Sequence, residues 1–283
     1  MTSRSAAEHH QSGINLAFER RFREAVSEYE KAARLDPNRS ETFYNLGVAY
    51  GELRQWKSAT AAYKRAIQLD PADWQAHCNL GVGFENSRRH AKAIDAFRSA
   101  AQLKPQEMQF FVSIGYNCGR LKRYAEAIEA YSRAVELEPD FAAGWYNIGL
   151  FHFHLDEFPE AILAEEKALA VGPAYDEPFV VIGMALEQSG DLDGALTALT
   201  RAAELNPNST EAHANLGSIY FQRNQFEAAL RQIRWALQLR PEEPWLHHAL
   251  AHTQWKRREI ISAVRGWCNA GFLCLIRGLG SRG

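Results

Sequence analysis

The sequence has few cysteines, the residues that disulfide-stabilised and many zinc-stabilised domains need. Its 283 residues contain four cysteines, and no two of them are spaced as Cys-x-x-Cys. A small secreted domain held by disulfides, or a zinc site built on paired cysteines, would need a denser pattern. We therefore expect reduced structural thiols, and we expect the chain to be cytoplasmic.

An excess of basic charge is also missing. The 32 lysines and arginines are balanced by 34 aspartates and glutamates, which gives a formal net charge of -2. This balance provides no basic footprint for a nucleic acid or for an anionic membrane surface. The first residues, MTSRSAAEHHQ, contain no apolar run. The sequence therefore predicts neither a signal peptide nor insertion into a membrane.

Motifs of catalysis are absent as well. The sequence has no glycine-rich phosphate loop, because its glycines fall inside predicted helices. His248 and His252 lie four residues apart, a spacing at which two histidines can share a metal ion, but no glutamate stands between them as in zinc proteases. Ordinary groove histidines are the alternative that we favour. We thus expect no enzyme, no catalytic residues, no cofactor and no metal site.

What the sequence does contain is a repeat of 34 residues. One proline recurs at this spacing without insertion or deletion: Pro37, Pro71, Pro105, Pro139, Pro173, Pro207 and Pro241. An alanine stands twelve positions before each proline: Ala25, Ala59, Ala93, Ala127, Ala161, Ala195 and Ala229. A glycine stands twenty-four positions before each: Gly13, Gly47, Gly81, Gly115, Gly149, Gly183 and Gly217. A period of this length is the signature of stacked helix-turn-helix hairpins.

The apolar residues of the second unit form two helical stripes. The first stripe has the spacing i, i+3, i+4 and i+7: Phe43, Leu46, Gly47 and Tyr50. The second has the spacing i, i+4 and i+7: Ala59, Tyr63 and Ala66. Closed by Pro71, this pattern resembles the tetratricopeptide repeat (TPR), and the resemblance covers residues 6–270. It implies an all-α, right-handed α-solenoid in which each hairpin needs its neighbours to complete a core.

We divide the chain into a lead at 1–5, a single TPR solenoid at 6–270, and an apolar, glycine-rich tail at 271–283. The eight predicted repeats cover 6–39, 40–73, 74–107, 108–141, 142–175, 176–209, 210–243 and 244–270. The tail contains an apolar run from Phe272 to Ile276. We favour its packing against the last repeat; the alternative is an exposed patch for self-association or for a partner.

The fifth repeat departs from the pattern. His152 stands in the last stripe position of its first helix, and Glu165 stands in the aromatic position of its second helix. These positions face each other in a TPR hairpin, so we hypothesise a partly buried, hydrogen-bonded pair. The alternative is that the helix ends loosen and both side chains reach water.

In TPR proteins the first helices of the hairpins line a concave surface. The resemblance therefore predicts a peptide-binding groove made by these residues: Tyr44, Asn45, Val48, Asn79, Val82, Tyr116, Tyr146, Asn147, Leu150, Met184 and Asn215. The asparagines resemble an interrupted form of the asparagine ladder in O-linked GlcNAc transferase, since a side-chain amide can both donate to and accept from a peptide backbone. The alternatives are that the asparagines are simply solvated and that neighbouring repeats cover the apolar residues.

The groove positions of this sequence hold few lysines or arginines, so the TPR clamp for acidic chaperone tails is not predicted. An apolar or amphipathic segment fits better. We predict a non-enzymatic module that binds an extended or helical segment of another protein and acts as an assembly scaffold. Charge substitution of Tyr44, Val48, Tyr146 or Leu150 should then weaken binding with little loss of folding. Two alternatives are a scaffold that forms homo-oligomers through its ends or tail, and the substrate-recognition subunit of a separate enzyme.

Overall fold

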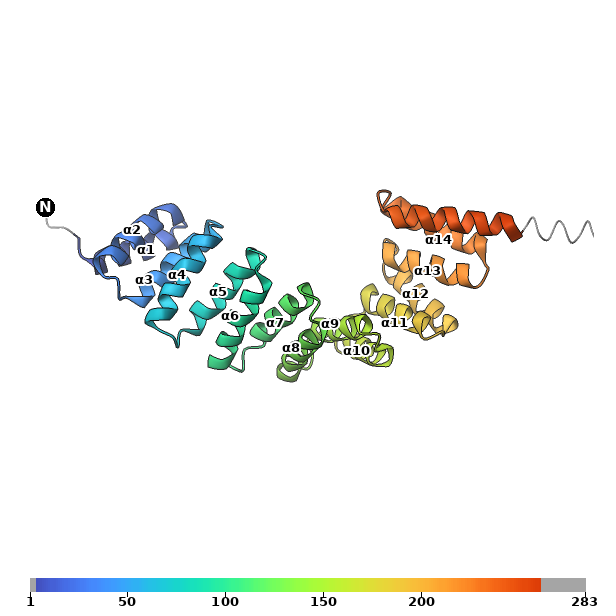
Figure 1. Ribbon diagram of the computed structural model, residues 1–283, viewed down its shortest axis with the longest axis horizontal. Helices are drawn as coiled ribbons and strands as arrows, with labels where there is room; N and C mark the ends of the chain where they lie inside the picture. Colours follow the sequence, from blue (N-terminus) through green and yellow to red (C-terminus); the bar gives the residue numbers. More distant parts are fainter. Residues whose placement is uncertain (1–3, 261–283) are drawn as a thin grey trace, which may run out of the picture. The chain divides into compact units, whose positions relative to one another are not determined.

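The computed structural model describes residues 4–260, which form helices and contain no β-strand. They divide into two compact units, one ending at Leu155 and the other starting at Asp156. Unit 1 consists of α1 (Ala6–Phe18), α2 (Phe22–Leu35), α3 (Ser40–Glu52), α4 (Trp56–Leu69), α5 (Trp74–Asn86), α6 (His90–Leu103), α7 (Met108–Arg120), α8 (Tyr124–Leu137) and α9 (Ala142–His154). Consecutive helices of this unit pack on one another from α1 to α9 (Figure 1). The expected all-α array of hairpins is confirmed.

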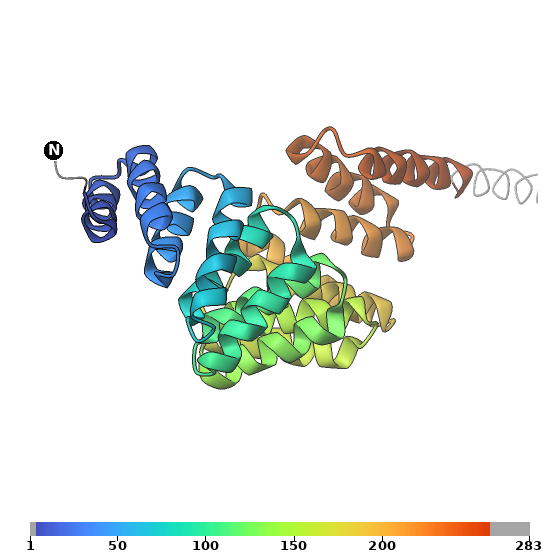
Figure 2. The ribbon, with the colours of Figure 1, turned by 60° about the vertical axis from the view of Figure 1, so that its left-hand side comes forward.

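Unit 2 is built in the same way. It consists of α10 (Phe158–Val171), α11 (Asp176–Gln188), α12 (Leu192–Leu205), α13 (Thr210–Gln222) and α14 (Phe226–Leu239), followed by a helix that begins at residue 244. Within the unit, α10 packs on α11, α11 on α12, α12 on α13, and α13 on α14. Ala214 of α13, Ala236 of α14 and Leu246 of the following helix share one core cluster, and Figure 2 shows these helices close together at the orange-to-red end of the chain. The predicted tail at 271–283 lies outside the described residues.

Small residues allow the helices of each hairpin to approach closely. Ala25, Ala59 and their equivalents down to Ala229 are fully buried. In the second hairpin, Gly47 of α3 faces the ring of Tyr63 of α4, which is 5% exposed. Backbone contact at glycine and alanine, with an aromatic or aliphatic side chain filling the space beside them, is the packing that the sequence predicts.

The recurring prolines determine where the second helix of a hairpin ends and the corner to the next hairpin begins. Each second helix of the first four hairpins ends two residues before the corner proline, because the residue before a proline is driven from helical to extended angles. Asp36 and Asp70 have that extended conformation, and each accepts a hydrogen bond from the backbone two residues later, at 3.1 Å. These aspartates thus stabilise the corner that the proline initiates.

Ring nitrogens from the following helix complete several corners. His77 Nε2 donates to the carbonyl oxygen of Pro71 at 3.2 Å, and Trp145 Nε1 donates to that of Pro139 at 3.1 Å. The same bond recurs at His213 and His247. The sequence shows these positions only as aromatic; the structure shows that a ring N–H there also satisfies a backbone carbonyl.

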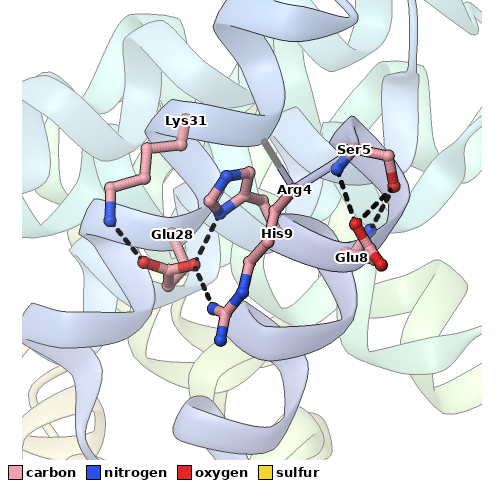
Figure 3. Close-up of polar contacts among 6 residues, drawn as sticks. All are labelled: Arg4, Ser5, Glu8, His9, Glu28 and Lys31. Atoms are coloured by element: carbon pink, nitrogen blue, oxygen red, sulfur yellow. Dashed lines mark hydrogen bonds and ion pairs between the residues drawn. The ribbon is translucent and has the colours of Figure 1, made fainter. Parts of the chain in front are cut away.

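The first hairpin replaces apolar packing with charged contacts. His9 stands at the position of Phe43, and its Nδ1 lies 2.7 Å from Glu28 Oε2 (Figure 3). Glu28 also pairs with Lys31 at 2.5 Å, and Arg4 approaches it at 3.8 Å. At the same end, Ser5 caps α1 through a reciprocal capping box with Glu8. The first hairpin thus presents charged groups where the second presents an aromatic side chain.

The prediction that Glu165 forms a hydrogen bond with His152 is wrong. Neither carboxylate oxygen of Glu165 has a hydrogen-bond partner among the described residues, so the predicted pairing with His152 is not made. The side chain is fully buried, and burial raises the pKa of its carboxyl to about 9. Glu165 is therefore a neutral, unpaired acid at pH 7, in a position where other hairpins hold Tyr63 or Leu199.

Candidate functional site

The predicted groove residues of unit 1 lie on one surface, which we call the first-helix face. It comprises the nine predicted residues Tyr44, Asn45, Val48, Asn79, Val82, Tyr116, Tyr146, Asn147 and Leu150, from α3, α5, α7 and α9, and also Ile14 of α1, which was not in the predicted set. All ten side chains are partly or largely exposed. They share a face because equivalent positions of successive first helices recur every 34 residues.

Three apolar side chains of this face are open to water. Ile14 is 37% exposed, Val82 is 38% exposed and Tyr116 is 45% exposed. They occupy the same register position in α1, α5 and α7, while the corresponding Val48 of α3 is half-buried. Neighbouring hairpins therefore do not cover this row. The residues stay available as apolar contacts for a bound segment.

A pocket of about 560 Å³ opens on the first-helix face between α1, α3 and α5. Its lining residues are His10, Ile14, Ser40, Glu41, Tyr44, Asn45, Asp70, Asp73, Trp74 and Gln75. Tyr44 and Asn45 are thus brought together with aromatic, apolar and carboxylate groups. None of these lining residues, all of which belong to the described part of the chain, is a lysine or an arginine.

The wall at Tyr44 is fixed by its neighbours. Asn79 Nδ2 donates to the Tyr44 hydroxyl at 3.2 Å, and the Tyr44 ring is tilted against that of Tyr63 with 6.2 Å between centroids. Burial raises the pKa of Tyr44 above its usual value, and the nearby carboxylate of Asp73 adds to the rise. The hydroxyl therefore stays protonated and can donate toward the pocket.

His10 forms the inner wall of the same pocket. It is 4% exposed, and its Nδ1 lies 3.0 Å from the hydroxyl oxygen of Thr42. Burial lowers the pKa of His10, and the nearby Arg39 guanidinium lowers it further. The imidazole is consequently neutral at pH 7 and adds no positive charge to the pocket.

The asparagine series is partly engaged within the protein. Asn79 is bonded to Tyr44, and Asn147 Nδ2 donates to the carbonyl of Ala143 at 2.6 Å. One N–H of each amide is thus used internally, and the side-chain oxygen is left as the acceptor for a ligand. The apolar row is consequently the more continuous feature of the face, and the predicted ladder stays a prediction.

A polar network beside the row was missed by sequence reasoning. Asn117 of α7 is fully buried, and its Nδ2 donates to Glu85 Oε2 at 2.6 Å and to the Ser113 carbonyl at 2.8 Å. Its Oδ1 accepts from His90 Nδ1 at 2.8 Å. The signal in the sequence is a large polar residue at the position of Ala49 in α3. The network holds the carboxylate of Glu85, which follows Val82 by three residues in α5.

A second pocket, of about 510 Å³, lies against α6, α7 and α8 and shares no lining residue with the first. Its base includes Phe111 and Ile114. Two ion pairs line it, Arg98 with Glu126 at 2.8 Å and Arg133 with Glu136 at 2.8 Å, and Glu129 lines it as well. Because both arginines of this pocket are held in ion pairs, they offer a ligand little free charge.

Unit 2 carries the two remaining predicted site residues. Met184 of α11 and Asn215 of α13 are both partly exposed. Close to them in sequence, Ser218 donates to Glu187 Oε1 at 2.7 Å, which links α13 to α11. His252 lies against Phe221, with 4.9 Å between ring centroids. Within the described residues no group of three potential metal ligands is assembled around His252 or elsewhere.

Over residues 4–260, none of the helices combines the length and the apolar character needed to cross a bilayer.

Tandem hairpins of this geometry define the chain as a TPR protein. A family model described as the C-terminal domain of cilia and flagella-associated protein 70, a TPR domain, matches residues 19–254. The chain belongs to this family. The resemblance identified from the glycine, alanine and proline register is therefore confirmed. No curated protein matches the chain significantly.

Solved structures show the same fold. The C-terminal part of a TPR-containing protein from Cytophaga hutchinsonii has a TM-score of 0.69 and 15% identity, covering 85% of this chain and 99% of that one. MamA has a TM-score of 0.53 and 26% identity, covering 56% of this chain and 93% of that one. Cut9–Hcn1, from a hetero-tetramer of APC/C, has a TM-score of 0.55 and 18% identity, covering 88% of this chain and 48% of that one.

Proposed function

We propose that this chain is a non-enzymatic binding module whose first-helix face in unit 1 holds a peptide segment of another protein and thereby helps to organise an assembly. The observation that carries the proposal is the uncovered row of Ile14, Val82 and Tyr116 beside the pocket at Tyr44. A folded protein has no packing reason to leave these side chains open in register.

Three considerations support the proposal. A TPR solenoid is in general a protein-binding scaffold, and the TPR neighbours Cut9–Hcn1 and Naa15/Naa10 with HypK were solved as complexes with other proteins. The face offers both apolar contacts and amide oxygens, which suits a segment with an exposed backbone. Ordering such a segment costs about 2–5 kcal/mol, so we expect a modest affinity.

The proposal can be tested with short peptides selected from a random display library against the full chain. Binding of the selected peptides is then measured for Val82→Lys and Tyr116→Lys. The matched control is Leu103→Lys in α6, because Leu103 is 43% exposed and lies off the first-helix face. We expect about a tenfold loss of affinity for the face variants and no change for the control. Equal affinities for all variants would place the binding surface elsewhere.

A further inference from the structure

We infer that the pocket between α1, α3 and α5 selects a basic side chain, arginine above all, flanked by apolar residues in the bound segment. The inference rests on the proposed function and adds the chemistry of the partner. Its starting point is an imbalance of charge: Glu41, Asp70 and Asp73 line the pocket, and no lysine or arginine does.

Two of these carboxylates are not neutralised by the protein. Glu41 is paired with Arg39 at 3.0 Å. Neither Asp70 nor Asp73 has an ion-pair partner among the described residues; each accepts a backbone hydrogen bond instead. Each uses one oxygen for the backbone: Asp70 Oδ1 accepts from the Ala72 N–H at 3.1 Å, and Asp73 Oδ1 accepts from the Ala76 N–H at 3.0 Å. The backbone bonds hold both carboxylates in place at the pocket and leave their negative charge for a ligand.

The aromatic walls favour a planar cation. The Tyr44 ring is held between Asn79 and Tyr63, so it presents a fixed surface to the pocket. Trp74 already has Lys104 Nζ at 4.5 Å from its ring centroid, and Lys104 is itself paired with Glu107 at 2.6 Å. A guest guanidinium would therefore stack on Tyr44 and face the two aspartates, a combination that suits arginine better than lysine.

Apolar residues next to the arginine follow from the surroundings of the pocket. Ile14 lines it, and the same register position continues along the face as Val48 and Val82. The charge pattern also distinguishes this site from the pocket against α6 and α8, because two arginines, Arg98 and Arg133, line that pocket and would repel a cationic guest. A segment that combines a basic residue with apolar ones therefore complements the first-helix face. It finds no equivalent site in the pocket against α6 and α8.

The test uses peptides selected against the full chain, with each arginine replaced in turn by citrulline, its neutral isostere. Binding is measured for the wild type and for the double variant Asp70→Asn, Asp73→Asn, which keeps both backbone-capping oxygens. The matched control is Asp36→Asn, because Asp36 makes the same corner bond in the first hairpin and does not line the pocket.

We expect the selected peptides to contain arginine beside apolar residues, and citrulline to weaken binding to the wild type about tenfold. The double variant should show the same loss and should no longer distinguish arginine from citrulline, while Asp36→Asn should bind as the wild type does. Peptides that bind equally well with citrulline, or that respond equally to Asp36→Asn, would overturn the inference. If peptides that tolerate citrulline still lose affinity for Val82→Lys, the proposed function stands and only the inference about arginine fails. If they bind Val82→Lys as well as they bind the wild type, the inference and the proposed function both fail.

Discussion

Gly47 and Tyr63 are in such close contact that a β-carbon on residue 47 would lie 2.5 Å from Tyr63 Cε1. The same relationship recurs between Gly13 and Tyr29 at 2.6 Å, and between Gly115 and Tyr131 at 2.5 Å. The glycine register is therefore a requirement of contact between the two helices of a hairpin, where an aromatic ring lies flat on the backbone.

Gly47→Ala should destabilise the chain by about 1–3 kcal/mol, because Tyr63 must leave its buried position to make room. Urea unfolding followed by circular dichroism measures the change. The matched control is Gly51→Ala in the same helix, where an added β-carbon would only touch Trp56 and the Tyr63 hydroxyl at 3.7 Å. Since alanine is the better helix former, that variant should be unchanged or more stable. A loss of equal size in both would show that close contact is not the cause.

Glu165 should make the stability depend on pH. Its carboxyl keeps its proton up to a pKa of about 9 in the folded chain, whereas the unfolded chain releases that proton near 4.5. Between these values the folded state binds more protons, so stability should fall as the pH rises, by at most about 1.4 kcal/mol per pH unit. Below pH 4.5 and above pH 9 this contribution should be flat.

Melting temperatures between pH 6 and pH 9 test this expectation. Glu165→Gln should flatten the curve, and Glu165→Leu should also raise the stability at pH 7, because leucine fills the equivalent position at Leu199 without a buried polar group. Glu166→Gln, an exposed neighbour on α10, is the control and should leave the pH dependence intact. A wild-type slope that survives in Glu165→Gln would assign the effect to another group.

Asn117→Asp should cost about 2 kcal/mol or more at neutral pH, because it replaces the donor to Glu85 by a second carboxylate with no change in size. Lowering the pH should restore part of the loss, as one of the two acids becomes protonated. Urea unfolding at two pH values measures this. Asn86→Asp is the control, since Asn86 is exposed on α5 and its side chain donates to the Val82 carbonyl of its own helix. If the control lost as much stability, the network would have no special role.

The sequence specified the hairpins because their packing depends on residues at fixed separations. Gly47, Ala59 and Tyr63 determine helix spacing directly, and Pro71 determines where the second helix ends. The turn between the two helices of a hairpin was harder to recognise in the sequence. Its left-handed residue is Gly190 in the sixth hairpin, but Arg54 at φ 56° in the second, and arginine does not mark such a position in a sequence.

The site could be predicted only in part, since its details depend on contacts between hairpins. The face containing Tyr44 and Val82 follows from helical register. That Asn79 would bond to Tyr44, and that the corner residue Asp73 would stand beside that hydroxyl, depends on how one hairpin rests on the next. Glu165 was recognisable as an exception to the pattern. Its lack of a hydrogen-bond partner depends on side-chain orientation, which register does not give.

The most direct test of the binding surface is photo-crosslinking. A benzophenone side chain is placed at Tyr116, which is 45% exposed on α7, or at Leu103, which is 43% exposed on α6, and each chain is irradiated with a selected peptide. The account predicts a peptide adduct at Tyr116 that an excess of unlabelled peptide removes, and none at Leu103. Adducts of equal yield at both positions, or at Leu103 alone, would contradict the assignment of the first-helix face as the binding surface.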